Sequence, residues 1–505
     1  MVGRSGIESL VSWFVKVAHP QEAHAVFYSA SSFFFILSAY FVIIPLRDEG
    51  AISLGLANLP ELFVGSLFLT LLAAPLSTLV FSLPHLSRPK ALVLILRFFS
   101  VSLALFFILW VSSSPGYSLS TFKGFFMKSS NIKQELKIDV GKSTPVHSSG
   151  WGDHGWFYIS VRIGLFLWVA LLNLITISST WARVIDVMDS ESGSRLFGFI
   201  GAGATLGQLF GSLFATGMAW MGPYLLLFAS VLMELAAQSS KRINMDKVYL
   251  SEELSLIRKP DNVEQTASAD EQTASAARGC SVNFFASLTN PKKWAIFDGL
   301  RLILSSTYLL QVSLFLWFSS AVSSFFYFQK VNVIATTIVS PTGRRMLFAQ
   351  INSFIAVFIL AGQLALTGRI LTFAGVTMAI CSSPIMGFFN LIAIAVWPSW
   401  VSIAVSETLR KVVNYVVTRP ARELLFTVVS QDEKYKAKVC IDVVVQRLGD
   451  ATAAGMYKLL YSSLSGKTTT ISLYFLPVCL LWIATAFHLG RRQTQLAKIQ
   501  TLSSS

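Results

Sequence analysis

Apolar blocks of about twenty residues recur along the 505-residue sequence, and each is long enough to cross a bilayer as a helix. Hydrophobic residues make up 53% of the chain and charged residues 13%, about half the charged share of a typical soluble domain. A single soluble core stops growing at about 250–300 residues, so it could not hold all of these blocks. The sequence therefore predicts an all-α, polytopic membrane protein embedded in a lipid bilayer.

Twelve such blocks are separated by polar connections, which predicts about twelve membrane-spanning helices. The expected spans are residues 25–45, 62–83, 91–111, 156–178, 196–219, 223–237, 300–326, 350–367, 376–397, 400–418, 438–460 and 471–489. A long polar segment divides them into six and six. This division is typical of transporters in which two helix bundles rock about a central site.

Changes in composition set the expected domain boundaries. The first residues form an amphipathic stretch suited to the membrane interface. The polar segment between the two sets of spans contains the tandem repeat EQTASAD-EQTASAA and cannot form a packed core, so we expect it to be largely disordered. The expected parts are an interfacial segment at 1–24, a six-helix bundle at 25–239, a cytoplasmic linker at 240–297, a second six-helix bundle at 298–490 and a basic tail at 491–505.

The net charge of +14 reflects membrane orientation. Lysine and arginine collect in the connections that twelve spans place on the same side as both termini, which the positive-inside rule assigns to the cytosol or its equivalent. A soluble protein with this charge would suggest a nucleic-acid partner. Here the bilayer explains the cations, so we expect no nucleic acid to bind.

Several charged residues lie inside the expected spans, where a charge near the bilayer centre costs about 2.5–3.5 kcal/mol. They and one asparagine are Arg97, Arg162, Glu407, Arg410, Lys411, Asn414, Asp442 and Arg447. The four from the tenth span share one helix stripe, and Glu407 is placed to pair with Lys411. The set either holds helices together by internal pairing or lines a wet cavity for an anion. Cations in both halves favour a cavity lined by Arg97, Arg162 and Arg410 or Lys411.

A glycine ridge in the fifth span, Gly203, Gly207 and Gly211, repeats every four residues, the pattern that lets membrane helices approach closely. No nucleophile has a histidine and an acid nearby in sequence, and the cysteines and histidines show no metal-ligand spacing. We therefore expect a protein that is not an enzyme and needs no cofactor or metal. We also expect it to work as a monomer.

Three motifs resemble one known family. They are Leu46-Arg47-Asp48, Ser194-Arg-Leu-Phe-Gly-Phe-Ile-Gly-Ala-Gly-Ala-Thr-Leu-Gly207, and Arg419-Pro-Ala-Arg-Glu-Leu-Leu-Phe-Thr-Val-Val429 followed by Lys434-Tyr-Lys-Ala-Lys438. Together they resemble the ATP/ADP translocase family of plastids and intracellular bacteria, and more closely its bacterial relatives, all of the major-facilitator type. The resemblance implies two six-helix bundles, alternating access and antiport of an anionic nucleotide.

The resemblance also implies roles for single residues. Arg47 and Asp48 match the exchangers' first-span motif and would contact substrate or gate the cavity mouth. Where those exchangers have a lysine this chain has Gly50, which removes a cation where phosphates would dock. Charged residues in equivalent connections of the two halves are interpreted as salt-bridge latches: Asp186, Arg195, Glu423 and Lys436.

The leading prediction is a secondary antiporter of nucleotides that works by alternating access. Two alternatives stay open: a transporter of another organic or phosphorylated anion, and a non-transporting membrane scaffold with the same fold. The membrane also stays open, either an organelle membrane such as the plastid envelope or the plasma membrane.

Overall fold

The computed structural model describes the helical body of the chain. The described residues are 20–82, 87–114, 155–187, 190–243, 295–365, 367–426, 428–429, 437, 440–464 and 467–504. Helices make up the regular structure in these ranges, and no strand occurs in them. The start of the expected interfacial segment and most of the expected linker, residues 244–294, lie outside the described residues.

Six long helices form the first bundle. They are α2 (Pro20–Ser53), α3 (Leu59–Ser82), α4 (Arg88–Ser113), α6 (Trp156–Val187), α7 (Ser190–Gly217) and α8 (Tyr224–Arg242). Helix α2 contacts α6, α7 and α8. Two short helical turns, η1 (Leu56–Asn58) and η4 (Ala219–Met221), follow α2 and α7 at one end of the molecule. We name this the outer end, because the positive-inside rule places it away from the cytosol.

The short helix α11 (Ala295–Ser305) precedes the second bundle. Its members are α12 (Thr307–Thr337), α13 (Pro341–Ala365), α14 (Thr367–Val396), α15 (Trp400–Val413) with η5 (Asn414–Thr418) and α16 (Arg419–Leu425), η6 (Ile441–Val445) with α18 (Gln446–Ser463), and α19 (Thr468–Ser504). Helix α14 is kinked at Gly375, which has a φ of 67°. Helix α19 continues through nearly all of the expected basic tail.

The predicted fold class is confirmed, with six helical crossings in each bundle. Nine of the described helices are long and apolar enough to span a membrane by length and hydropathy alone. Three further helical segments, α8, the α15–α16 run and α18, complete the two sets of six. These three carry most of the charged side chains that the sequence places inside spans, and those charges lower their hydropathy.

Helix α12 extends well beyond the expected end of the seventh span. The sequence predicts an end at residue 326, but the helix continues to Thr337. The reason is that Gln329, Lys330 and Asn332 are buried against other helices, so these polar residues do not mark the membrane surface. A hydropathy profile cannot make this distinction, because it measures composition and not the surroundings of a side chain.

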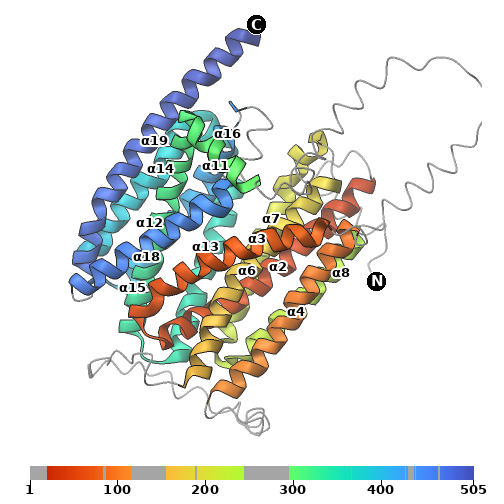
Figure 1. Cartoon of the computed structure of the whole chain (residues 1–505), viewed down its shortest axis with the longest axis vertical. Coiled ribbons are helices and arrows are strands. Elements are labelled where there is room, and N and C mark those ends of the chain that lie inside the picture. The colour runs from red at the N-terminus through yellow and green to blue at the C-terminus, as the bar shows by residue number, and fades with distance from the viewer. Residues whose placement is uncertain are drawn as a thin grey trace, which may run out of the picture.

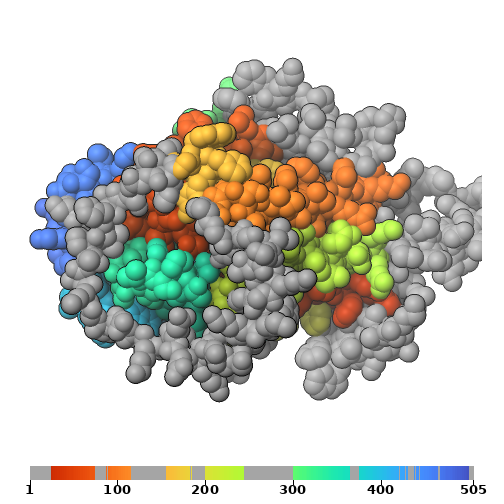
Figure 2. Space-filling model, turned by 90° about the horizontal axis from the view of Figure 1, so that it is seen from below, coloured from red at the N-terminus to blue at the C-terminus, as the bar shows by residue number. Residues whose placement is uncertain are grey.

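The two bundles meet along α7 and α13 and along α3 and α18, and α2 also contacts α13 (Figure 1). At the outer end, Leu54, Leu62 and Phe166 of the first bundle belong to the same buried apolar cluster as the second bundle. Helices α4 and α8 lie side by side on the surface at the far side of the molecule from α19 (Figure 2). The bundle interface and the α4–α8 surface are thus separate regions.

The glycine ridge of α7 packs directly on the backbone of α2. A Cβ atom added to Gly203 would lie 2.6 Å from the carbonyl oxygen of Ala30, and one added to Gly211 would lie 2.5 Å from that of Ser38. A Cβ on Gly207 would overlap the backbone of Phe34. The α2 backbone cannot move aside as a flexible side chain can, so the ridge sets the separation of the two helices.

We predict that Gly207→Ala lowers the free energy of unfolding by about 1–3 kcal/mol, the usual cost of overpacking. Gly201→Ala is the matched control on the same helix, because its added Cβ meets nothing within 4 Å. Thermal unfolding of both purified variants in the same detergent measures the effect. Equal unfolding temperatures for the two variants would contradict the packing argument.

Candidate functional site

Arg47 and Asp48, near the end of α2, form a buried ion pair that also contacts the second bundle. Asp48 Oδ1 accepts hydrogen bonds from Arg47 Nη2 at 2.6 Å and Nε at 2.9 Å. It accepts a third from the hydroxyl of Tyr327 on α12, at 2.8 Å. Asp48 is only 1% exposed, so these donors take the place of water at Oδ1, whereas Oδ2 is buried with no hydrogen-bond partner among the described residues. The Arg47 guanidinium lies 4.9 Å from the centroid of the Phe166 ring.

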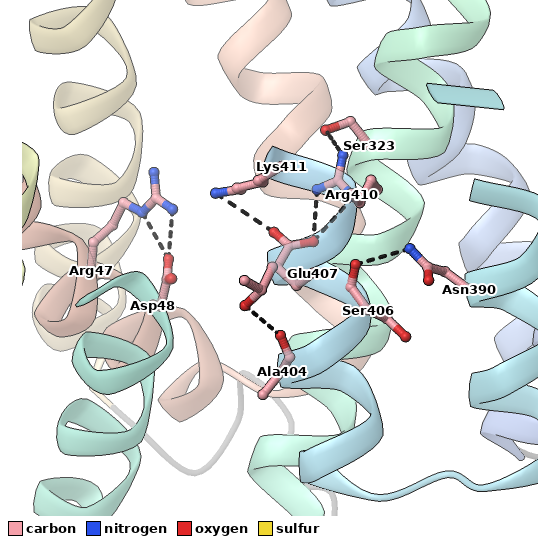
Figure 3. A network of polar contacts seen from close by, with 10 residues as sticks. Arg47, Asp48, Ser323, Asn390, Ala404, Ser406, Glu407, Arg410 and Lys411 are labelled. Atoms are coloured by element: carbon pink, nitrogen blue, oxygen red, sulfur yellow. Dashed lines mark hydrogen bonds and ion pairs between the residues drawn. The ribbon is translucent and has the colours of Figure 1, made fainter. Parts of the chain in front are cut away.

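Glu407 on α15 is the centre of a second buried charge group. Its Oε2 atom accepts hydrogen bonds from Arg410 Nη2 at 2.7 Å and Nε at 3.2 Å, and its Oε1 atom lies 3.6 Å from Lys411 Nζ. Arg410 Nη1 donates to the hydroxyl of Ser323 on α12 at 2.9 Å. Figure 3 shows the Lys411 amine and the Arg47 guanidinium directed toward each other from the two bundles.

Lys330 on α12 is a buried cation that the sequence analysis missed, because it lies beyond the expected end of its span. It is 5% exposed. Its Nζ atom lies 5.2 Å and 5.7 Å from the ring centroids of Tyr327 and Phe348, and it has no hydrogen bond or ion pair with any described residue. It interacts electrostatically with Asp48 and Glu407, so it belongs with the two groups above. One feature of the sequence could have revealed Lys330. In the stretch FYFQKVNVI, apolar residues continue past the lysine, which indicates that the helix does not end there.

Arg447 and Asp450 form a third group on α18. Arg447 Nη1 lies 3.1 Å from Asp450 Oδ2. Asp450 Oδ1 accepts hydrogen bonds from the hydroxyls of Ser320 and Ser324 on α12, at 2.5 Å and 2.6 Å. This carboxylate therefore joins α18 to α12 within the second bundle.

These three groups form one central cluster at the bundle interface. Helix α12 carries a hydrogen-bond partner for each group: Tyr327 for the first, Ser323 for the second, and Ser320 and Ser324 for the third. The cluster holds five cations and three carboxylates: Arg47, Lys330, Arg410, Lys411 and Arg447 with Asp48, Glu407 and Asp450. It thus carries two positive charges that no carboxylate of the cluster compensates, which suits an anionic ligand.

Asn414, the last residue of the predicted tenth-span stripe, opens the π-helical turn η5 and is partly buried. A second π-helical turn, η6, precedes α18. Single π-helical turns inside α-helices occur frequently at functional sites. The turn directly follows the segment that carries Glu407, Arg410 and Lys411, so it sets the direction in which the helix continues.

Arg97 and Arg162 lie apart from the central cluster. Arg97 pairs with Glu234 of α8 on the exterior of the first bundle, with N–O distances of 3.1 Å and 3.2 Å. The Arg162 guanidinium carbon lies 3.2 Å and 4.2 Å from the ring centroids of Trp110 and Tyr158. Two serine hydroxyls at the end of α4 accept its hydrogen bonds. Sequence periodicity placed both arginines inside spans but could not show which neighbour each one faces.

Asp442 also lies apart from the cluster, at the start of η6. Its Oδ1 atom lies 2.5 Å from Arg422 Nη2 of α16 and accepts a hydrogen bond from Gln446 at 2.9 Å. This ion pair is partly exposed and joins the two sides of the connection between α16 and α18. The side chains of the four expected latch residues, Asp186, Arg195, Glu423 and Lys436, lie outside the described residues.

Among the described residues, two ion pairs join the bundles, both at the outer end. Glu49 Oε2 of α2 lies 3.4 Å from Arg345 Nη1 of α13, and Arg345 Nε donates to the carbonyl of Ala219. Glu61 Oε1 of α3 lies 2.6 Å from Lys458 Nζ of α18. The first pair is buried and the second is about half exposed, so together they cross the interface from interior to surface.

Two side chains fill the space beside Gly50. A Cβ atom on Gly50 would lie 2.9 Å from the Trp110 ring and 3.3 Å from Cδ of Arg162. The space that a side chain would enter here is therefore already filled. Trp110 and Arg162 thus occupy the space beside α2 at this position.

Comparison with known proteins supports the sequence resemblance. Residues 318–493 match the family described as TLC ATP/ADP transporter, and this stretch contains the second bundle's whole contribution to the central cluster. No curated protein matches the sequence at a significant level.

Solved structures show the same fold. The chain is similar to a mutant of the peptide transporter POT in complex with alafosfalin, at 12% identity and a TM-score of 0.53, covering 97% of this chain and 99% of that chain. It is also similar to a POT family transporter in complex with a thioalcohol conjugated peptide, at 10% identity and a TM-score of 0.53, covering 94% and 96%. At these identities the likeness shows the fold alone.

We predict that Arg410→Met destabilises the protein by about 3–5 kcal/mol, because it leaves Glu407 buried without its main partner. Lys458→Met is the matched control, because it breaks an exposed ion pair and costs about 0–1 kcal/mol. Thermal unfolding in detergent, with both variants beside the parent protein, measures the difference. If Arg410→Met lowers the stability no more than Lys458→Met does, the stability of buried Glu407 does not depend on the Arg410 guanidinium.

Proposed function

We propose that this multi-pass membrane protein is a nucleotide antiporter that works by alternating access, because residues 318–493 match the TLC ATP/ADP transporter family and the fold is similar to that of solved transporters. The observation that carries the proposal is the positive surplus of the central cluster, where the two bundles meet. Buried cations are costly unless something compensates them, and an anionic substrate would do so.

Phosphate groups would contact the cations that have the weakest internal partners. Lys330 has no hydrogen bond or ion pair with a described residue, and Lys411 is 3.6 Å from a carboxylate that Arg410 already holds at 2.7 Å. Lysine is a compact point charge that phosphates bind readily. We expect these two amines to face the phosphates.

Aromatic rings near the cluster would contact the base. Phe166 and Tyr327 flank the Arg47 guanidinium, and Tyr40 lies within electrostatic reach of it. Bases stack on aromatic rings with little dependence on sequence, at about 1–3 kcal/mol per base. Cations and rings side by side thus fit a nucleotide better than a simple inorganic anion.

Gly50 favours a second candidate, a transporter of another phosphorylated or organic anion. The site lacks a lysine at this position, and Trp110 and Arg162 fill the space that its side chain would need. The third possibility, a non-transporting scaffold, would be favoured by a sealed apolar interior. The interior described here instead holds a cationic cluster at the bundle interface.

Alternating access gives the outer ion pairs a role. Glu49–Arg345 and Glu61–Lys458 bind the bundles together at the outer end, as does the hydrogen bond from Tyr327 to Asp48. For the outer end to open, all three contacts would have to break. We therefore assign this conformation as outer-closed.

Counter-exchange in liposomes tests the transported substrate. We predict saturable uptake of labelled ATP or ADP that requires unlabelled nucleotide inside, and a loss of at least about tenfold in Lys330→Gln, which corresponds to 1.4 kcal/mol or more. Lys90→Gln is the control, because Lys90 lies at the exposed start of α4, away from the cluster. Competing phosphorylated sugars and organic acids are included in the same assay.

The second candidate would be favoured if a phosphorylated sugar or organic acid inhibits uptake and unlabelled nucleotide inside the liposomes does not stimulate it. Folded protein that exchanges none of these compounds would overturn the transport proposal and favour the scaffold.

A reversible crosslink tests the outer ion pairs as a gate. In a background without native cysteines, we predict that joining Glu61→Cys to Lys458→Cys with a short reducible reagent stops transport, and that reduction restores it. Ser100→Cys with Ser230→Cys is the matched control, because these hydroxyls lie 3.2 Å apart within the first bundle. Full transport by the crosslinked outer pair would mean that this end need not open.

A further inference from the structure

The Arg97–Glu234 ion pair lies on the exterior of the first bundle, between α4 and α8. The Arg97 side chain is 53% exposed and that of Glu234 is 35% exposed. Exposed apolar side chains surround the pair on the same two helices: Leu94, Phe98, Val101, Leu227, Val231 and Leu235. Charge therefore interrupts a surface that otherwise has the composition of a lipid-facing one.

The pair also lies well inside its two helices, away from their ends. Arg97 is seven residues beyond Lys90 on α4, and Glu234 is seven residues before Lys241 on α8. Seven residues correspond to about 10.5 Å along an α-helix. Charged side chains at such depth almost always face protein or water, so hydrocarbon alone is a poor covering for this pair.

The bond within the pair leaves polar atoms unused. Arg97 Nε and Nη2 both donate to Glu234 Oε1. Arg97 Nη1 and Glu234 Oε2 have no partner among the described residues. One free donor and one free acceptor thus lie beside each other on the same exposed face.

In place of the monomer expected from the sequence, we propose that this α4–α8 face is the interface of a symmetric homodimer. A two-fold axis places the same patch of both copies together, so that Arg97 meets the partner's Glu234 and Glu234 meets the partner's Arg97. A patch with one cation and one anion is complementary to itself in this arrangement. Polar pairs between helices stabilise association within membranes, where apolar contacts alone give little preference over lipid.

A second copy fits this patch better than lipid does. An anionic headgroup would match Arg97 but would be repelled by Glu234, and acyl chains would satisfy neither group. The face also lies across the molecule from α19 and apart from the bundle interface (Figures 1 and 2). Each copy of the dimer thus keeps its central cluster and its bundle motion.

Co-capture of two differently tagged copies from polymer-extracted membrane discs tests this interface. The parent protein should capture a second copy. Copies with Arg97→Glu should fail to capture each other, because each patch then holds two carboxylates. Copies with Glu234→Arg should also fail, because each patch then holds two guanidinium groups. Co-expression of the two variants should restore capture several-fold, because an acidic patch then meets a basic one.

This restoration separates the dimer from a fold effect, because both variants lose the ion pair within their own chain. Thermal unfolding and elution volume of each single variant establish that it is folded. Parent protein found only as single copies in the discs, or mixed variants that associate no better than each alone, would overturn the proposal. If the discs hold single copies that retain anionic lipid at this face, the ion pair binds a lipid headgroup and the dimer proposal is wrong.

Discussion

Charged side chains inside the spans need polar partners, and some of these partners come from the opposite bundle. The Asp48 carboxylate illustrates the point, because a single oxygen accepts hydrogen bonds from Arg47 in its own helix and from Tyr327 in the opposite bundle. In hydrocarbon this group would be costly to leave unpaired. The same bonds that lower this cost hold α2 against α12.

The sequence was sufficient to predict the fold but not the ends of every helix. Twelve apolar segments in the sequence predicted the helical segments of the two bundles, and charged residues lower the hydropathy of the three that do not qualify as spans by length and hydropathy alone. A clear difference is at α12, where the expected span ended at residue 326 but the helix continues to Thr337 through polar residues that are buried in protein. Hydropathy treats every polar residue as solvated, and this assumption fails wherever helices bury polar groups against each other.

The site was predictable only within single helices. The spacing of Glu407, Arg410 and Lys411 predicted one stripe, and the structure shows these side chains in contact. Arg97 and Arg162 show the limit of the method, because periodicity gives the residues that share a face and not the helix that this face contacts. Asp48 and Tyr327 are 279 residues apart in sequence, a contact that no local pattern encodes.

The distribution of cations over the two bundles suggests how binding and movement are coupled. The first bundle contributes Arg47, already paired with Asp48, whereas the second contributes the weakly partnered Lys330 and Lys411. An anion held between them would compensate charge on both sides and draw the bundles together, while an empty site would leave like charges facing each other. A ligand shifts a conformational equilibrium only through such a difference in interaction between states. In the proposed alternating-access cycle, substrate charge would therefore control the movement of the bundles, and a compound with too little negative charge would bind without promoting it.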